Sequence, residues 1–294
     1  MKNNMNEITI KSNAKINLGL DIVGKRDDGY HLLKTVMQSV SLCDILKIEK
    51  SDAISVECSD KNIPFSEENL AYKAAKAFFS ETKIKSGAHI FIEKNIPSQA
   101  GLGGGSADAA GTIYALNKLY KTYLSDEQLC KIGAKVGSDV PFCIVGGTML
   151  CEGVGEILTP LKNIYEHTIL IAKGKSGIST VEAYKTYDKL NGINHPDIDM
   201  LVNAINNEEN FYHYCKNVLE LTAFLSSVDE IKETMTEFGA HVSAMTGSGS
   251  AVFGIFENKT LAEKCCQEFK KSGIYAFVST PTDKGIEEIY KNAV

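Results

Sequence analysis

Residues 8–22 largely alternate between apolar and polar side chains. The apolar ones occupy even positions: Ile8, Ile10, Ile16, Leu18, Leu20 and Ile22. The odd positions between them include Lys15, Asn17, Gly19 and Asp21. A period of two is typical of a β-strand with one buried face, so we predict a strand whose second face is polar.

The next segments predict a strand, a glycine-rich loop and a helix in direct succession. Residues 69–79 have the apolar spacing of a helix, and residues 88–93 have the composition of a strand. Glycines are concentrated at 101–105, and a helix is expected to begin near Ser106. The glycine-rich loop therefore joins the end of a strand to the start of a helix.

A further helix is predicted after position 125. Residues 125–128 (Ser-Asp-Glu-Gln) match a capping box, and Gly137 is placed where a glycine commonly ends a helix. Asp139 is expected in the turn just past that helix. Pro141 and the apolar residues 142–145 predict a return to extended structure.

The pattern changes beyond about residue 162, where strands alternate with helices in a new order. Strands are predicted at 168–172, 241–246, 251–256 and 275–279, with helical segments at 179–238 and 259–271. That order is typical of a split βαββαβ unit with extra helices inserted. We therefore predict an α+β protein with two domains, residues 1–162 and 163–294.

Composition narrows the class of protein. The chain has 294 residues, 44% hydrophobic and 23% charged, with a net charge of −6, which excludes a disordered chain. We find no apolar stretch that could span a bilayer and no signal segment, so we expect a cytoplasmic protein with no membrane partner. The acidic balance and the lack of a Lys/Arg-dense patch argue against a nucleic-acid partner.

The eight cysteines do not indicate disulfides or a metal site. They are scattered along a long chain without a secretory signal, so we interpret them as reduced core thiols. No pair has CxxC spacing, and no cysteine lies at zinc-ligand spacing from another cysteine or a histidine. We therefore expect no structural metal.

The loop at 97–106 is the strongest candidate for ligand binding. Glycine lets a backbone approach an anion closely, and a helix N-terminus adds free N–H groups and partial positive charge. A phosphate site follows, although a flexible loop or tight turn has the same composition. The chain has no GxxxxGK[ST] motif, and no acidic residue follows at the distance that a dinucleotide site requires. A dinucleotide dehydrogenase is therefore disfavoured.

Two charged residues could supply phosphoryl-transfer chemistry. Taken alone, Lys15 could be a solvated strand residue and Asp139 a turn former. An alcohol that attacks a phosphoryl group needs a carboxylate to take its proton and a cation to moderate the charge, because such reactions depend on positioning and electrostatics. Together, Lys15 and Asp139 could provide both.

Five motifs in order carry a family resemblance that covers almost the whole chain. They are AKINL (14–18), GKRDDGYHLL (24–33), GLGGGSADAA (101–110), GSDVPF (137–142) and TGSGSAVFG (246–254). Together they resemble the GHMP kinase superfamily, and AKINL followed by GKRDDGYH narrows the substrate. The resemblance implies an N-terminal ribosomal S5 domain 2-like domain, a ferredoxin-like C-terminal domain, and a site between them.

The resemblance also implies an activity. It is ATP-dependent phosphorylation of the 2-hydroxyl of 4-diphosphocytidyl-2-C-methyl-D-erythritol, in non-mevalonate isoprenoid precursor biosynthesis. It assigns Asp139 as the base for that hydroxyl and Lys15 as the cation beside it. Asn17, on the same strand face as Lys15, would hydrogen-bond the erythritol part. The cofactors implied are ATP and Mg²⁺, with the ion held partly by the phosphates.

Two groups of binding residues are carried over in the same way. Where the superfamily often has a second serine, this chain has alanine at 107. The implied ATP-binding residues are Pro97, Ser98, Gln99, Ala100, Gly101, Leu102, Gly103, Gly104, Gly105, Ser106 and Ala107, with Asn69 near adenine. The implied cytidine contacts are Tyr30, His31, Thr180 and Tyr184, although Tyr184 at helical spacing could equally be a core aromatic.

Two alternative functions remain open from the sequence. One is a GHMP kinase for another alcohol, such as mevalonate or a sugar, against which Tyr30-His31 argues. The other is a nucleotide-binding module without catalysis, against which the presence of both Lys15 and Asp139 argues. The expected partner is a small cytidylyl diphosphate substrate, and the expected state is a monomer or a weak homodimer.

Overall fold

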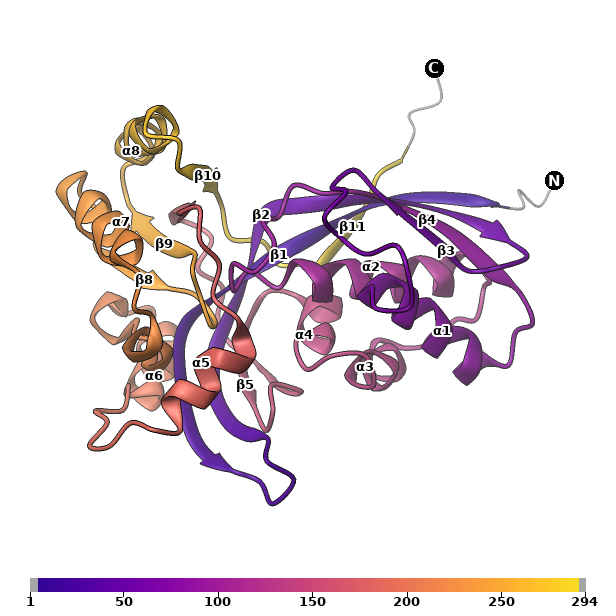
Figure 1. The fold of residues 1–294 in the computed structure, drawn as a ribbon, viewed down its shortest axis with the longest axis horizontal. Coiled ribbons are helices and arrows are strands. Elements are labelled where there is room, and N and C mark those ends of the chain that lie inside the picture. Colours follow the sequence, from indigo (N-terminus) through magenta and orange to yellow (C-terminus); the bar gives the residue numbers. More distant parts are fainter. Residues whose placement is uncertain (1–4, 291–294) are drawn as a thin grey trace.

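A computed structural model describes residues 5–290 and arranges them as two lobes, each built on one sheet (Figure 1). The first lobe contains a seven-stranded sheet in the order β11-β1-β2-β4-β3, with β5 beside β2 and β6 beside β5. Its strands are β1 (Glu7–Lys25), β2 (His31–Ser51), β3 (Ser55–Cys58), β4 (Gly87–Glu93), β5 (Thr148–Glu152), β6 (Ile157–Pro160) and β11 (Ile286–Glu288). Its helices are α1 (Leu70–Thr82), α2 (Gly104–Leu119), α3 (Asp126–Ala134) and α4 (Val140–Val145).

The predicted first strand is confirmed as β1, but its burial differs from the prediction. Burial alternates only over residues 7–11, and every residue from Ser12 to Ile22 is buried. Both faces are covered there because α2 packs on β1 near Gly111, while side chains of α6 (Ile198–Asn207) lie against Gly19. The odd-numbered polar residues therefore lie in the interior and do not form a solvated face.

Local sequence signals explain where the helices of the first lobe begin. The capping box is confirmed, since Ser125 and Gln128 exchange side-chain-to-backbone hydrogen bonds at the start of α3. Residues 142–145 were predicted as extended, and this is wrong, because they belong to α4. Proline in the first turn of a helix loses no hydrogen bond, so Pro141, the second residue of α4, fits a helix where the sequence suggested a strand.

The second lobe contains a four-stranded antiparallel sheet in the order β10-β7-β9-β8. With α7 and α8 as its two crossing helices, this is the ferredoxin-like order and confirms the predicted βαββαβ unit. Its strands are β7 (Thr168–Lys173), β8 (Val242–Met245), β9 (Val252–Phe256) and β10 (Tyr275–Ser279). Its helices are α5 (Thr180–Tyr187), α6, α7 (Ser226–Glu237) and α8 (Lys259–Lys271), with 3₁₀ turns at Tyr212–Tyr214 and Val218–Thr222.

The chain returns to the first lobe after completing the second. Strand β11 pairs antiparallel with β1, so the first sheet contains residues from both ends of the chain. The domain division at residue 162 stays a prediction. All eight cysteines are free thiols, six of them buried. None of the helices in residues 5–290 combines the length and the apolarity needed to span a bilayer.

Candidate active site

A cavity of about 880 Å³ lies between the two lobes and collects most of the residues singled out from the sequence. Its walls come from β1, the β1–β2 hairpin, the glycine loop, the turn before α4, α5 and the β8–β9 turn. The predicted residues that line it are Lys15, Asn17, Tyr30, His31, Asn69, residues 97–105, Asp139, Thr180 and Tyr184. Ser106 and Ala107 lie in the first turns of α2 and are not among its lining residues.

Lys15 and Asp139 meet in this cavity although 124 positions separate them in the chain. The Lys15 ammonium lies 3.5 Å from Oδ2 of Asp139 and donates a hydrogen bond of 2.7 Å to Oδ1 of Asn17. Asn17 in turn donates from Nδ2 to Oγ1 of Thr35 at 2.9 Å. Lys15 is only 4% exposed, so these contacts fix the direction of a buried cation.

Asp139 presents its carboxylate to the open part of the cavity. It is the N-cap residue of α4, and its side chain is 27% exposed. The backbone of Gly155 lies alongside, where an added Cβ would be 3.8 Å from Oδ1 of Asp139. A carboxylate that is held by a cation on one side and reachable on the other can accept a proton from a bound ligand.

The glycine loop packs so tightly that side chains would not fit at its turning points. Gly101 and Gly103 have φ angles of +75° and +69°. A Cβ on Gly101 would lie 2.0 Å from the carbonyl oxygen of Thr246, and one on Gly103 would lie 2.9 Å from Cγ of Lys15. The Lys15 N–H donates to the Leu102 carbonyl at 3.0 Å, which fastens the loop to β1.

The start of α2 leaves donors available at the end of this loop. Its N-cap is Gly103, and no side chain caps the helix. The first N–H groups of a helix lack intrahelical partners, and the helix dipole adds partial positive charge there. The loop and the helix start therefore form a site suited to phosphate groups.

The β8–β9 turn of the second lobe closes against this loop. Ala251 N–H donates to the carbonyl of Ala100 at 3.1 Å, and Asn17 N–H donates to Oγ1 of Thr246 at 2.9 Å. Asn217 supports the turn by donating from Nδ2 to the Gly247 carbonyl at 2.8 Å. Gly247 and Ser248 both line the cavity, so the second lobe contributes backbone to the site.

An aromatic pair lies at the other end of the cavity. The rings of His31 and Tyr184 are stacked, with centroids 4.8 Å apart and an interplanar angle of 28°. Burial raises the pKa of the Tyr184 phenol above its usual value. His31 Nε2 lies 2.7 Å from Oδ1 of Asp188, whose other oxygen accepts from Lys25 at 2.6 Å. Tyr30, at the hairpin tip, is 64% exposed.

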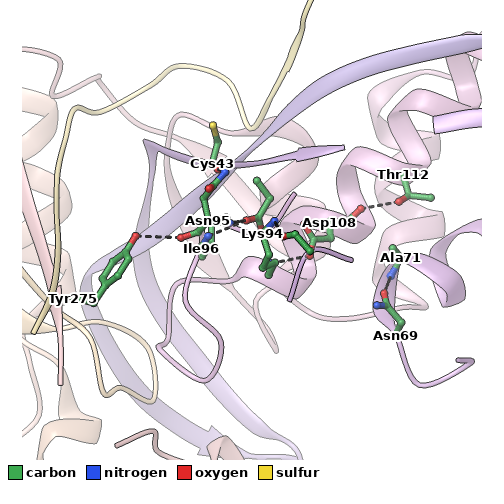
Figure 2. Close-up of polar contacts among 11 residues, drawn as sticks. Cys43, Asn69, Ala71, Lys94, Asn95, Ile96, Asp108, Thr112 and Tyr275 are labelled. Atoms are coloured by element: carbon green, nitrogen blue, oxygen red, sulfur yellow. Dashed lines mark hydrogen bonds and ion pairs between the residues drawn. The ribbon is translucent and has the colours of Figure 1, made fainter. Parts of the chain in front are cut away.

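The remaining predicted residues occupy less open positions. Thr180 shares a hydrogen bond of 2.9 Å with Ser248 across the cavity wall. Asn69 caps α1, accepting from the Ala71 N–H at 2.8 Å (Figure 2). Its Nδ2 donates to the Pro64 carbonyl at 2.9 Å. Its side-chain amide is therefore already engaged within the protein.

Sequence reasoning missed several residues of the cavity wall. Asp188 belongs to no motif and Lys25 was not singled out within GKRDDGYHLL, and their pairing across 163 positions becomes visible only in the fold. Lys94 and Asp108 also line the cavity and were missed, although Asp108 lies within the motif GLGGGSADAA. Within residues 5–290, no group of three or more His, Cys, Asp or Glu side chains is arranged to hold a metal ion.

Comparison with known proteins agrees with this geometry. Residues 69–147 match the family model "GHMP kinases N terminal domain", and residues 191–274 match "GHMP kinases C terminal". A curated relative from Clostridium beijerinckii, named 4-diphosphocytidyl-2-C-methyl-D-erythritol kinase, is 44% identical over 275 residues, 92% of this chain and 98% of the relative. The chain belongs to this family of GHMP kinases.

Solved structures show that kinases with different names share this fold. A crystal structure of 4-(cytidine 5'-diphospho)-2C-methyl-D-erythritol kinase matches with a TM-score of 0.77 at 30% identity, covering 93% of this chain and 99% of that one. A homoserine kinase from Cytophaga hutchinsonii matches with a TM-score of 0.80 at 18% identity, covering 98% and 99%. The GHMP fold is thus shared by kinases with different names, and backbone similarity alone does not identify the alcohol that this family member phosphorylates.

Proposed function

We propose that this chain transfers the γ-phosphoryl group of ATP to the 2-hydroxyl of 4-diphosphocytidyl-2-C-methyl-D-erythritol, giving the 2-phosphate and ADP. The reaction belongs to non-mevalonate isoprenoid precursor biosynthesis. One observation carries the proposal: Lys15 and Asp139 converge in the cavity that also contains the glycine loop and the start of α2. The names of the curated relatives supply the substrate.

Asp139 acts as the base in this proposal. The acceptor oxygen forms a bond to the γ-phosphorus while the bond from that phosphorus to the β–γ bridging oxygen breaks and ADP leaves. A carboxylate is too weak a base to deprotonate an alcohol beforehand, so the proton moves to Asp139 as the new bond forms. The partial exposure of the carboxylate supports this role, because the alcohol has to reach it.

Lys15 stabilises negative charge on the acceptor oxygen and on the transferred group. A buried ammonium is effective because little water screens it. Its hydrogen bond to Asn17 holds it in place before substrate arrives, so no reorganisation is needed during the reaction. We propose that Asn17 also contacts the erythritol part.

The phosphates of ATP lie, in this proposal, along residues 97–105 and at the start of α2. Glycines at which a Cβ would collide with neighbouring atoms leave backbone N–H groups free to face an anion. Mg²⁺ accompanies ATP, held mainly by phosphate oxygens and water, and neutralises phosphate charge when bound. That arrangement fits a site whose described residues form no ready-made cage of carboxylates and histidines.

The cytidine end of the substrate lies beside His31, Tyr184 and Tyr30 in this proposal. The stacked rings of His31 and Tyr184 offer an aromatic surface, and the imidazole can reach the edge of a pyrimidine. The hydrogen bond between Asp188 and Nε2 of His31 holds the imidazole ring in place. We further propose that the enzyme works in the cytoplasm as a monomer or a weak homodimer.

A substrate panel tests the proposal. ADP release is measured with the cytidylyl substrate, mevalonate, galactose and homoserine, and the product is located by ³¹P NMR. We expect turnover with the cytidylyl substrate alone and a new phosphomonoester at the 2-position. Turnover only with one of the other alcohols would disprove the assigned substrate, and ATP binding without turnover of any alcohol would favour a non-catalytic module.

A further inference from the structure

A buried lysine holds together the two ends of the glycine loop. Lys94 follows β4, Asp44 is on β2, and Asp108 is in the second turn of α2. The Lys94 ammonium donates to Oδ2 of Asp108 at 2.8 Å (Figure 2). It also donates to Oδ2 of Asp44. The side chains of Lys94, Asp44 and Asp108 are 6%, 0% and 5% exposed. We call these three residues the buried triad.

Asp44 extends the triad to the residues just before the loop. Its second oxygen, Oδ1, accepts from the N–H groups of Asn95 at 2.6 Å and Ile96 at 2.8 Å. On the far side of the loop, a Cβ on Gly104 would lie only 3.0 Å from the Lys94 ammonium. The triad therefore contacts the chain on both sides of residues 97–103.

The second lobe also contacts the residues just before the glycine loop. The Tyr275 hydroxyl, on β10, donates to the carbonyl of Asn95 at 3.1 Å, as Figure 2 shows. Burial raises the pKa of Tyr275 to about 12, so the hydroxyl keeps its proton. The start of the loop is thus held by a carboxylate from the first lobe and a phenol from the second.

Stability alone is a poor explanation for this arrangement. Burying a cation with two carboxylates carries a large desolvation cost, and well-packed apolar side chains commonly stabilise a core as well or better. A group of fixed charges does give a loop a single position, which a ligand site requires. The triad lies beside the loop that the proposed function assigns to the phosphates of ATP.

We infer that Lys94 is a positioning residue which, with Asp44 and Asp108, holds the glycine loop in its ATP-binding shape. The inference rests on the proposed function only in requiring that ATP binds at this loop. Lys94 acts through the backbone of Asn95, Ile96 and α2, and the nucleotide gains affinity because the loop is already ordered when it binds.

The charges of the triad are compatible with a nearby polyanion. Burial lowers the pKa of Lys94, but Asp108 and Asp44 more than offset this and keep the ammonium charged. Burial also raises the pKa of Asp108 to about 8, with Lys94 opposing and Asp44 adding to the shift. Oδ1 of Asp108 has no hydrogen-bond partner among the described residues. The charged Lys94 and the raised pKa of Asp108 both reduce the negative charge that the triad places beneath the phosphates.

Binding and kinetics of three variants test the inference. Lys94→Met, Asp44→Asn and Tyr275→Phe each weaken one part of the support without entering the proposed catalytic pair. A non-hydrolysable ATP analogue is titrated calorimetrically into each, and KM is measured for ATP and for the cytidylyl substrate. Lys34→Met is the control, because Lys34 is also a lysine paired with an aspartate, Asp199, but does not contact the loop.

We expect the analogue to bind about tenfold more weakly to Lys94→Met and Asp44→Asn, and two- to threefold more weakly to Tyr275→Phe. The KM for the cytidylyl substrate and kcat at saturating ATP should change less than threefold, and Lys34→Met should bind the analogue normally. Because Lys94→Met leaves two carboxyls buried, the double variant Lys94→Met/Asp108→Asn is made as well. Its loss should be no larger than that of Lys94→Met alone, since both act on one unit.

Three results would overturn the inference. Unchanged analogue affinity in folded Asp44→Asn and Tyr275→Phe, with a loss confined to Lys94→Met, would mean that Lys94 contacts the nucleotide itself. Equal increases in both KM values would mean a general structural defect. Normal affinity in all variants would remove the triad from ATP binding. Because calorimetry needs no acceptor alcohol, failure of the assigned substrate leaves this test intact.

Discussion

At the scale of single residues, Lys15 connects the parts that the proposed reaction needs. Its backbone N–H holds the glycine loop through Leu102, and its ammonium contacts Asn17 and Asp139. One residue of β1 therefore sets the distance between the loop and the carboxylate. The resemblance of AKINL and GSDVPF to family motifs singled out Lys15 and Asp139, and the structure places the two side chains 3.5 Å apart; their catalytic roles stay a prediction.

Replacing Asp139 separates binding from chemistry. Asp139→Asn keeps the shape of the side chain but removes the proton acceptor, so we expect kcat to fall by about 10³-fold. Affinity for an ATP analogue should stay within threefold, because the carboxylate is required only as the reaction proceeds. Steady-state kinetics and calorimetry measure the two effects, with the exposed, remote Asp229→Asn as control. Near-normal kcat in Asp139→Asn would remove Asp139 from the mechanism.

The buried triad predicts an unusual dependence of stability on pH. Burial is the main reason that the pKa of Asp108 is raised to about 8 in the folded protein, from an ordinary value of 3.8. Between these values the folded state keeps a proton that the unfolded chain releases, so this group makes the protein less stable as pH rises from about 4 to about 8.

The amide introduced by Asp108→Asn would not titrate, so this variant should not lose this stability as pH rises. The unfolding free energy of the variant should therefore increase relative to that of the parent. We expect the difference to shift by at least about 1 kcal/mol in favour of the variant between pH 5 and pH 9. Urea unfolding at each pH measures it, and the exposed Glu67→Gln serves as control. A difference that stays constant with pH would show that Asp108 is ionised throughout.

Buried charged residues such as these are the hardest to predict from sequence. Asp108 looks like any polar residue in an alanine-rich helix, and its partners Lys94 and Asp44 stand 14 and 64 positions before it. Desolvation and ion pairing are properties of the assembled core. Without the fold, nothing distinguishes Lys94 from a solvated surface lysine.

At the scale of elements, local signals predicted several elements closely, missed strands such as β2, and failed where two structures share one composition. The strand at 275–279 and the helix at 259–271 agree with β10 and α8 residue for residue. Residues 142–145 were assigned wrongly, because a short apolar run fits a buried strand or a buried helix equally well. Packing of α4 against α2 and α3 decides between them.

The glycine loop offers a test at this scale. Gly101→Ala places a Cβ where φ is +75° and the Thr246 carbonyl oxygen would be 2.0 Å away. We expect unfolding free energy to fall by at least about 2 kcal/mol, or ATP affinity to fall by tenfold or more as the loop moves. Gly273→Ala is the matched control, with φ of +72° and no atom within 4 Å of the added Cβ, and should cost about 1 kcal/mol. Equal effects would show that the close approach at Gly101 is unimportant.

The β1–β2 hairpin offers a second test, through Tyr30. Because Tyr30 is 64% exposed, Tyr30→Ala should leave the melting temperature unchanged. Loss of an aromatic surface beside a pyrimidine should raise KM for the cytidylyl substrate about tenfold and leave KM for ATP unaltered. Initial rates at varied substrate measure this, with Tyr123→Ala, which is 83% exposed, as control. An unchanged KM would mean that the cytosine binds elsewhere.

At the scale of the whole molecule, the chain passes from the first lobe to the second and back again. The ferredoxin-like order of the second sheet was predictable, because its strands and helices each have a clear period. The pairing of β11 with β1 was not, because a three-residue strand has no detectable period and its partner stands about 275 positions earlier. The second lobe is consequently bounded on both sides by strands of the first sheet.

The pairing of β11 with β1 predicts how fragments behave. Residues 1–162 lack β11, which leaves the edge of β1 unpaired and removes the partners of Asn13, whose N–H donates to Gly285 and whose side chain donates to Lys284. Tyr114 also loses the carboxylate of Glu288, 2.7 Å away. An exposed strand edge favours aggregation.

We therefore expect residues 1–162 to aggregate or to melt at least about 10 °C below a second fragment, in which a glycine–serine linker joins residues 1–162 to residues 280–290. Circular dichroism and light scattering measure both fragments. A scrambled 280–290 segment on the same linker is the control. If the short fragment melted as high as the joined one, the first lobe would be complete without β11, and the division at residue 162 would mark a true domain boundary.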